Sequence, residues 1–154
     1  MPEVGERAPD FALYDSGKKV RKMSEFLVKG RRTIFAFFPG AFTGVCDQEM
    51  CAFRDMYAEL EKLNGLVVGI SVDAPFAQKA FAEKYAITFP LLCDFKREVV
   101  QRYGVVWKNL GGVDGYDVAN RSIFVTDDSG KVVFKWVAEN PGKLPDFEAI
   151  KKAL

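Results

Sequence analysis

The chain has 154 residues, a formal net charge of +1 and no histidine. This length suits one domain with a sizeable core, and the 49% apolar fraction excludes a disordered chain. The near-neutral charge creates no field that recruits nucleic acid or anionic lipid. Without histidine, Ser-His and Cys-His catalytic arrangements and most zinc sites are excluded. We therefore expect a single domain over residues 1–154, with no cofactor, no metal and no nucleic-acid partner.

The first residues, MPEVGERAP, contain no apolar signal region, and no apolar run in the sequence is long enough to span a bilayer. We therefore expect a cytoplasmic protein that does not contact membranes. In that compartment, its three cysteines are better explained by redox chemistry or core packing than by a disulfide framework.

Strand and helix patterns alternate along the chain. Residues 11–14 and 20–23 flank Asp15-Ser16-Gly17, which predicts an early hairpin. The elements predicted after it are residues 32–38 (strand), 45–63 (helix), 66–71 (strand), 75–85 (helix), 91–93 (strand), 97–103 (helix), 121–126 and 131–136 (hairpin) and 145–154 (helix). The glycine-rich residues 109–120 predict a flexible surface loop. This order predicts an α/β fold in which helices flank both faces of a central mixed sheet.

The most informative segment is PGAFTGVCDQEMC, residues 39–51, between a predicted strand and a predicted helix. It places Cys46 in the first turn of the helix, where free backbone N–H groups and the positive end of the helix dipole favour a thiolate. Thr43 is the expected N-cap, which brings its hydroxyl close to the sulfur. A buried structural thiol is the alternative. The strand, the Pro-Gly turn and the cap all converge on Cys46, which favours a nucleophile.

Several segments resemble the peroxiredoxin family. Residues 39–46, PGAFTGVC, resemble its active-site signature, in which Pro, Thr and Cys have a fixed spacing. GERAPDF at residues 5–11 and FPLLCD at residues 89–94 resemble two further family motifs, and Arg121 stands where the family places an active-site arginine. Residues 39–51 also resemble the bacterioferritin comigratory (PrxQ) and AhpE-like branches. The resemblance covers nearly the whole chain and implies a thioredoxin-like fold with peroxiredoxin insertions.

The resemblance implies a thiol-dependent peroxidase that reduces hydrogen peroxide and organic hydroperoxides. Cys46 would attack the peroxide and become a sulfenic acid. The Thr43 hydroxyl and the Arg121 guanidinium would stabilise the developing charge, Pro39 would shield the sulfur from water, and Glu49 would hold the arginine. Each residue also has a simpler explanation. Pro39 fits an ordinary turn, Thr43 a cap, Glu49 a carboxylate favoured by the helix dipole, and Arg121 a solvated surface cation.

Cys51 lies five residues after Cys46, the spacing at which PrxQ-like members place a resolving cysteine. In an intact helix the two residues would be rotated roughly 140° apart, with Cα atoms about 8–9 Å apart. A disulfide needs Cα atoms within about 7 Å, so the bond requires the first turns of the helix to unwind. The alternative is a passive Cys51 and an external resolving thiol. Cys93 ends a predicted core strand, so we expect a buried structural thiol there, with a resolving role as its second possibility.

The implied partners are a peroxide and a reductant such as thioredoxin, glutaredoxin or another thiol, and the chain is expected to be a monomer or a homodimer. A non-catalytic redox sensor on the same fold is the competing function. A thioredoxin-type disulfide oxidoreductase needs C-x-x-C, whereas this chain has C-x-x-x-x-C. Neither phosphate-binding glycine motif of nucleotide-binding enzymes occurs in the sequence.

Overall fold

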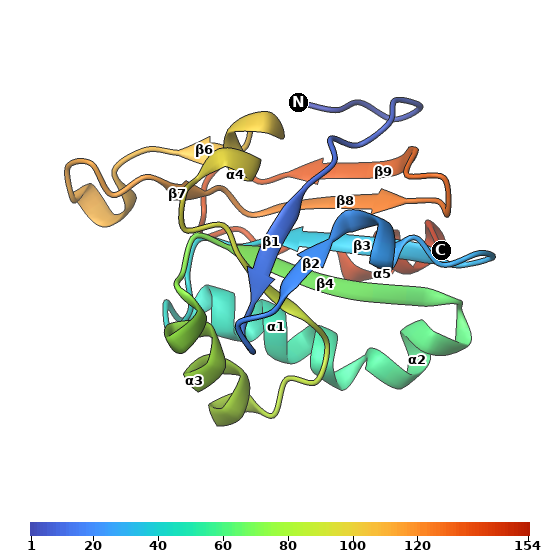
Figure 1. Cartoon of the computed structure of the whole chain (residues 1–154), viewed down its shortest axis with the longest axis horizontal. Coiled ribbons are helices and arrows are strands. Elements are labelled where there is room, and N and C mark those ends of the chain that lie inside the picture. The colour runs from blue at the N-terminus through green and yellow to red at the C-terminus, as the bar shows by residue number, and fades with distance from the viewer.

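A seven-stranded sheet forms the centre of the molecule (Figure 1). The computed structural model describes the backbone of residues 1–154 and every side chain except that of Cys46. The strands of the sheet, in chain order, are β1 (Ala12–Asp15), β2 (Val20–Lys22), β3 (Arg32–Phe37), β4 (Gly65–Ser71), β5 (Leu91–Cys93), β8 (Ser122–Thr126) and β9 (Val132–Val137). They lie side by side in the order β2-β1-β5-β4-β3-β8-β9.

The sheet is mixed, as the sequence predicts. β3, β4 and β5 are parallel neighbours, while β8 runs antiparallel to β3 and β9 antiparallel to β8. β1 and β2 form the predicted hairpin at one edge, and β8 and β9 form the predicted hairpin at the other. β3 is therefore a central strand with partners on both sides, and the chain enters the Pro39 segment directly from it.

Helices cover both faces of the sheet, which confirms the predicted α/β class. They are α1 (Val45–Asp55), α2 (Tyr57–Lys62), α3 (Pro75–Tyr85), α4 (Glu98–Arg102), α5 (Phe147–Lys152) and the 3-10 turn η1 (Met23–Phe26). α1, α2, α3 and α5 pack on one face, and α4, η1 and the N-terminal segment pack on the other. In Figure 1, α1, α2 and α3 lie on the side of the sheet opposite α4.

The alternation of side chains along β3 explains the two cores. Successive residues of a strand point to opposite faces, so Ile34, Ala36 and Phe38 enter one core while Phe35 and Phe37 enter the other. All five side chains are fully buried. A run that is apolar at every position therefore folds as a strand covered on both faces.

The prediction of one helix over residues 45–63 is wrong. The structure has two helices, α1 and α2, separated at Met56, whose backbone has φ −86° and ψ −1°. A helical residue has ψ near −42°, so the chain changes direction there. The break leaves Phe53 before it and Leu60 after it, both buried in the same core.

The glycine-rich residues 109–120 are more ordered than a flexible loop. They contain the 3-10 turn η2 (Leu110–Gly112) and β7 (Val118–Ala119), which pairs antiparallel with β6 (Val106–Trp107). This small sheet extends beside α4 in Figure 1. Two-residue strands are too short for a periodic pattern, which explains why the sequence analysis missed them.

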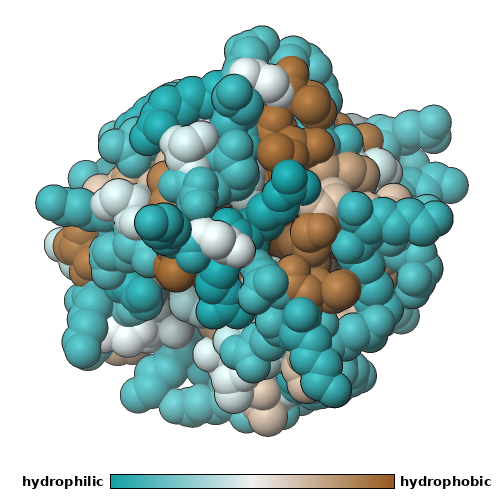
Figure 2. Space-filling model, turned by 90° about the vertical axis from the view of Figure 1, so that its right-hand side faces the viewer, coloured by the Kyte–Doolittle hydropathy of each residue, from teal (hydrophilic) through white to brown (hydrophobic). Residues whose placement is uncertain are grey.

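The surface carries one band of hydrophobic residues among mostly hydrophilic ones on the face shown in Figure 2, which is the end of the molecule near α2 and the C-terminus in Figure 1. Among the residues that the structure describes, no helix combines the length and the apolar composition needed to cross a bilayer.

Candidate active site

The segment between β3 and α1 is held by the neighbouring parallel strand. Phe38 N donates a hydrogen bond to Ile70 O at 2.9 Å, which extends the pairing with β4 up to Pro39. Three residues further on, Ala41 N donates to Asp73 Oδ2 at 2.8 Å. Because Asp73 follows β4, two successive contacts with this strand and its end fix the start of the segment.

Asp73 is itself fixed by side chains of β4 and α3. Its Oδ2 accepts a hydrogen bond from Ser71 Oγ at 2.7 Å, and Ser71 Oγ accepts one from Gln78 Nε2 at 2.8 Å. Gln78 and Ser71 are fully buried. The network therefore connects the core of the β4–α3 unit to the backbone of Ala41.

Thr43 is not the N-cap of α1, contrary to the sequence prediction. The helix begins at Val45, its N-cap is Gly44 with φ 75°, and no side chain caps it. The Thr43 hydroxyl instead donates to Gly40 O at 2.7 Å and closes the turn that precedes the helix. Gly44 supplies the positive φ that an L side chain disfavours at this position, so the helix starts at Val45 as predicted but with Gly44 rather than Thr43 as its N-cap.

Cys46 is the second residue of α1, so its backbone lies in the first turn of a helix that follows a core strand. This agrees with the position predicted from the sequence. The predicted environment of the thiol concerns the Cys46 side chain, which lies outside the part of the chain that the structure describes.

Arg121 is buried and paired with a buried carboxylate. Its Nη1 lies 2.8 Å from Glu49 Oε1, and both residues are at most 1% exposed. Its Nε and Nη2 donate to Pro141 O at 3.1 and 2.9 Å. The guanidinium is thus oriented by two partners from different parts of the chain, and the solvated surface cation considered from the sequence is excluded.

Burial raises the pKa of Glu49 from 4.5 to about 7, and the nearby charge and hydrogen bond of Arg121 oppose this rise. Desolvation is the larger effect because the carboxyl group has no exposed surface. Among the described residues, the second oxygen, Glu49 Oε2, has no hydrogen-bond partner. A buried carboxyl group with a hydrogen-bond donor at only one of its two oxygens favours its protonated form.

Folding stability should therefore fall with rising pH because of Glu49. Between pH 4.5 and about 7, the folded chain retains the Glu49 proton while the unfolded chain has lost it. Stability falls wherever the folded state binds more protons than the unfolded state. Urea titrations at several pH values should show this decline in the wild type and a smaller decline in Glu49→Gln. An equal decline in both proteins would show that another group is responsible.

Three of the predicted site residues line one cavity of about 170 Å³ beside the start of α1. Its lining consists of Pro39, Thr43, Val45, Leu110, Arg121, Pro141 and Gly142. The walls are mainly apolar, and among the described residues of the lining Arg121 is the charged one. Such a site combines a fixed cation with mainly apolar walls, an arrangement that can stabilise a developing negative charge.

Sequence reasoning missed several residues of this site. Asp73 had a detectable signal, since the carboxyl ends of neighbouring parallel strands meet at the same edge of a sheet and Asp73 follows β4. Leu110 and Pro141 carried no such signal. They reach the site from the short 3-10 turn η2 and from the segment after β9, which lie far from Cys46 in the sequence.

Cys51 lies on the same continuous helix as Cys46, and its side chain is partly exposed. Desolvation raises the pKa of the Cys51 thiol, while the Arg54 guanidinium lowers it and the carboxylates of Asp55 and Asp47 raise it further. The thiol is therefore partly accessible, but Cys51 lies five positions after Cys46 along a continuous helix in this conformation.

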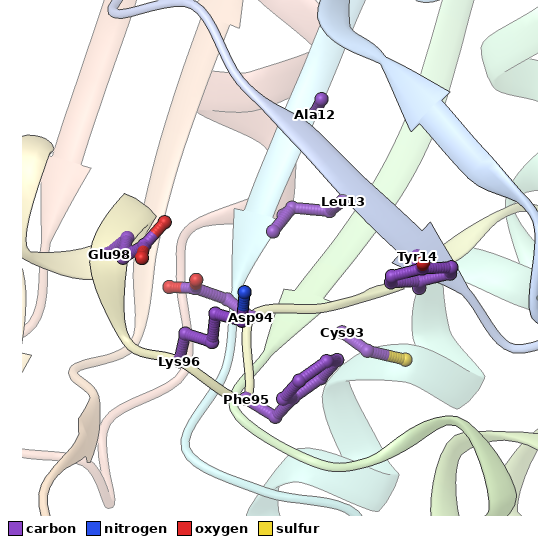
Figure 3. Close-up of a pocket in the computed structure, with 8 residues that line it drawn as sticks. All are labelled: Ala12, Leu13, Tyr14, Cys93, Asp94, Phe95, Lys96 and Glu98. Carbon is purple, nitrogen blue, oxygen red and sulfur yellow. The ribbon is translucent and has the colours of Figure 1, made fainter.

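Cys93 is buried, as expected from the sequence. Only 1% of it is exposed, and burial raises the pKa of its thiol to about 12. Figure 3 shows its side chain between the rings of Tyr14 and Phe95, at a pocket of about 100 Å³. β4 lies between β5, which carries Cys93, and β3, which leads to Cys46. A thiol in this setting is neither ionised at neutral pH nor next to Cys46 along the sheet.

No cluster of three potential metal ligands is found among the described side chains.

Comparison with known proteins gives consistent matches. The family model described as "AhpC/TSA family" matches residues 4–135. A putative peroxiredoxin bcp of Coxiella burnetii is 35% identical over 151 residues, which cover 92% of this chain and 98% of that protein. Alkyl hydroperoxide reductase E of Mycobacterium tuberculosis is 36% identical over 148 residues, which cover 95% of this chain and 92% of that protein.

Solved structures agree with these relatives. The crystal structure of peroxidoxin BcpB from Mycobacterium tuberculosis has a TM-score of 0.83 at 30% identity and covers 99% of this chain and 94% of that one. AhpC from the same organism has a TM-score of 0.81 at 22% identity, covers 99% of this chain and 91% of that one, and supports the thioredoxin-like fold alone. The chain therefore belongs to the AhpC/TSA family of peroxiredoxins, close to the Bcp/PrxQ and AhpE branches, and it is a thiol-dependent peroxidase.

Proposed function

We propose that Cys46 is the peroxidatic cysteine of this thiol peroxidase, and that Cys51 resolves its oxidised form as an intramolecular disulfide. The observation that carries the first part is the position of Cys46 at the start of α1, next to a cavity lined by Pro39, Thr43 and Arg121. Free N–H groups of the first helical turn and a buried guanidinium both favour negative charge there.

In the first step, the Cys46 thiolate attacks the distal oxygen of a hydroperoxide and breaks the O–O bond. The sulfur becomes a sulfenic acid, and the leaving alkoxide or hydroxide takes a proton and departs as an alcohol or water. Arg121 stabilises the charge that develops on the leaving oxygen, and Glu49 and Pro141 hold its guanidinium plane. Thr43 and Pro39 shape the entrance and exclude water from the reacting sulfur.

In the second step, the Cys51 sulfur attacks the sulfenic acid sulfur. A disulfide forms and water leaves, and an external dithiol of the thioredoxin or glutaredoxin class then reduces the bond by thiol–disulfide exchange. Because α1 is continuous from Val45 to Asp55, the disulfide forms only after its first turns have unwound. The alternative is a one-cysteine mechanism, in which an external thiol attacks the sulfenic acid directly.

The two mechanisms predict different masses for the oxidised protein. After one equivalent of hydrogen peroxide, the wild type should lose two protons, and peptide mapping should place the bond between Cys46 and Cys51. Cys51→Ser should instead retain one added oxygen at Cys46, while Cys93→Ala should behave as the wild type. A stable sulfenic acid at Cys46 in all three proteins would establish the one-cysteine mechanism.

We also infer that residues 1–154 form one domain and that the protein acts in the cytoplasm as a monomer or homodimer. One seven-stranded sheet includes strands from both ends of the chain, which supports a single domain.

The hydrophobic band in Figure 2 offers a contact surface for a homodimer. Sedimentation equilibrium distinguishes the two states.

A further inference from the structure

The C-terminal end of α3 contacts the chain on both sides of Cys46. After Cys46 in the sequence, Asp47 Oδ2 accepts a hydrogen bond from the Tyr85 hydroxyl at 2.7 Å. Before Cys46, the ring of Phe42 lies 6.5 Å from the Tyr85 ring, measured between centroids. One side chain therefore bridges the residue after Cys46 and the residue four positions before it.

Both contacted residues have features that this bridge helps to stabilise. Phe42 has φ 64°, a left-handed conformation that is unusual for an aromatic residue, and its ring packs on Phe81 at 5.4 Å as well as on Tyr85. Asp47 Oδ1 is buried and has no hydrogen-bond partner among the described residues. The Tyr85 hydroxyl is therefore the described group that satisfies this carboxylate.

A further contact ties α1 to the same end of α3. Arg54 Nη1 donates to the carbonyl oxygen of Tyr85 at 2.6 Å. This carbonyl belongs to the last residue of α3, where the helix leaves its own acceptors without partners. We call Tyr85 with Phe42, Asp47 and Arg54 the Tyr85 clamp. Its contacts on α1, at Asp47 and Arg54, lie on either side of Cys51 in the sequence.

The clamp opposes the conformational change that the proposed resolving step requires. Unwinding the first turns of α1 displaces Asp47 and breaks the hydrogen bond from Tyr85. Disulfide formation proceeds only through the unwound form, so its rate follows the fraction of molecules in that form. Losing a hydrogen bond to a charged acceptor at a half-buried site should raise this fraction about 5- to 30-fold.

We propose that Tyr85 is a positioning residue for the resolving step, and that it controls whether oxidised Cys46 forms a disulfide or is oxidised further. The inference rests on the proposed role of Cys51. Two reactions compete for the sulfenic acid. Attack by Cys51 releases water and gives the disulfide, whereas reaction with a second hydroperoxide adds one oxygen to the sulfur, gives a sulfinic acid and releases an alcohol or water. By holding α1 wound, the clamp slows the first reaction and leaves more time for the second.

The test compares Tyr85→Phe with the wild type. This variant removes only the hydroxyl and keeps the ring packed between Phe42 and Phe81. Acid-quenched samples, alkylated and analysed by mass, give the rates of sulfenic acid and disulfide formation separately. We expect disulfide formation to accelerate about 5- to 30-fold with no change in sulfenic acid formation. At high peroxide, the sulfinic fraction should fall by a similar factor.

Tyr14→Phe is the matched control, because it removes a hydroxyl from a tyrosine on β1 that is 46% exposed and outside the clamp. Amide hydrogen exchange over residues 45–51 should accelerate in Tyr85→Phe and not in Tyr14→Phe. Equal disulfide rates in the wild type and Tyr85→Phe would overturn the clamp alone. Absence of a Cys46–Cys51 disulfide in the wild type would overturn both the resolving role of Cys51 and the inference that depends on it.

Discussion

Replacing Cys46 with serine should reduce peroxidase turnover to the background rate of the assay. A serine hydroxyl remains protonated at neutral pH and cannot carry the oxidised sulfur states of the cycle, so no intermediate forms. The measurement is hydrogen peroxide consumption with a dithiol reductant in excess. Thermal unfolding of the same variant checks that the fold is intact.

Cys93→Ala is the control for this experiment. Cys93 is buried on β5 with a thiol pKa raised to about 12, so its removal should leave turnover unchanged. Retained turnover in Cys46→Ser together with lost turnover in Cys93→Ala would reverse the assignment and identify Cys93 as the nucleophile.

Replacing Arg121 with methionine should lower the second-order rate constant for Cys46 oxidation by about 10²- to 10³-fold, the usual effect of removing one fixed donor from a developing oxyanion. The same change leaves Glu49 buried without its cation. Breaking a buried ion pair from one side typically costs about 3–5 kcal/mol. Because the pKa of Glu49 is already raised to about 7, protonation should absorb part of this loss.

Two further variants separate charge from geometry. Arg121→Lys keeps a positive charge but loses the planar arrangement of donors that reaches Glu49 and Pro141 together, so we expect an intermediate rate. The double variant Arg121→Met with Glu49→Gln should recover stability but not rate. Stopped-flow oxidation rates and urea unfolding measure the two effects independently. A full rate in the double variant would exclude Arg121 from the chemistry.

Much of the architecture could be predicted from local patterns. The apolar run in β3, the hairpin turn at Asp127-Asp128-Ser129-Gly130 and the 3.6-residue period of α3 each encode their element directly, and α3 has the predicted bounds. The Cys46 position followed from the order of strand, turn and helix. These features depend on residues close together in the sequence.

The remaining features depend on contacts between distant segments. The break at Met56 lies inside a continuous amphipathic pattern, and the residues on either side of it, Phe53 and Leu60, enter the same core. The N-cap shifted from Thr43 to Gly44 because the Thr43 hydroxyl bonds to Gly40 instead. Tyr85 lies 38 positions from Asp47, to which it donates a hydrogen bond, a separation at which local patterns carry no information.

If Cys51 resolves Cys46 as proposed, Pro39 sets one boundary of the region that rearranges. Phe38 N donates to Ile70 O, which extends the pairing with β4 to the residue before Pro39, and the proline ring then fixes φ where the chain leaves the sheet. The break at Met56 sets the other boundary. On the proposed two-cysteine mechanism, opening and closing of this segment would leave the sheet intact, so each turnover would involve local unfolding on the microsecond-to-second timescale of such motions rather than unfolding of the whole domain.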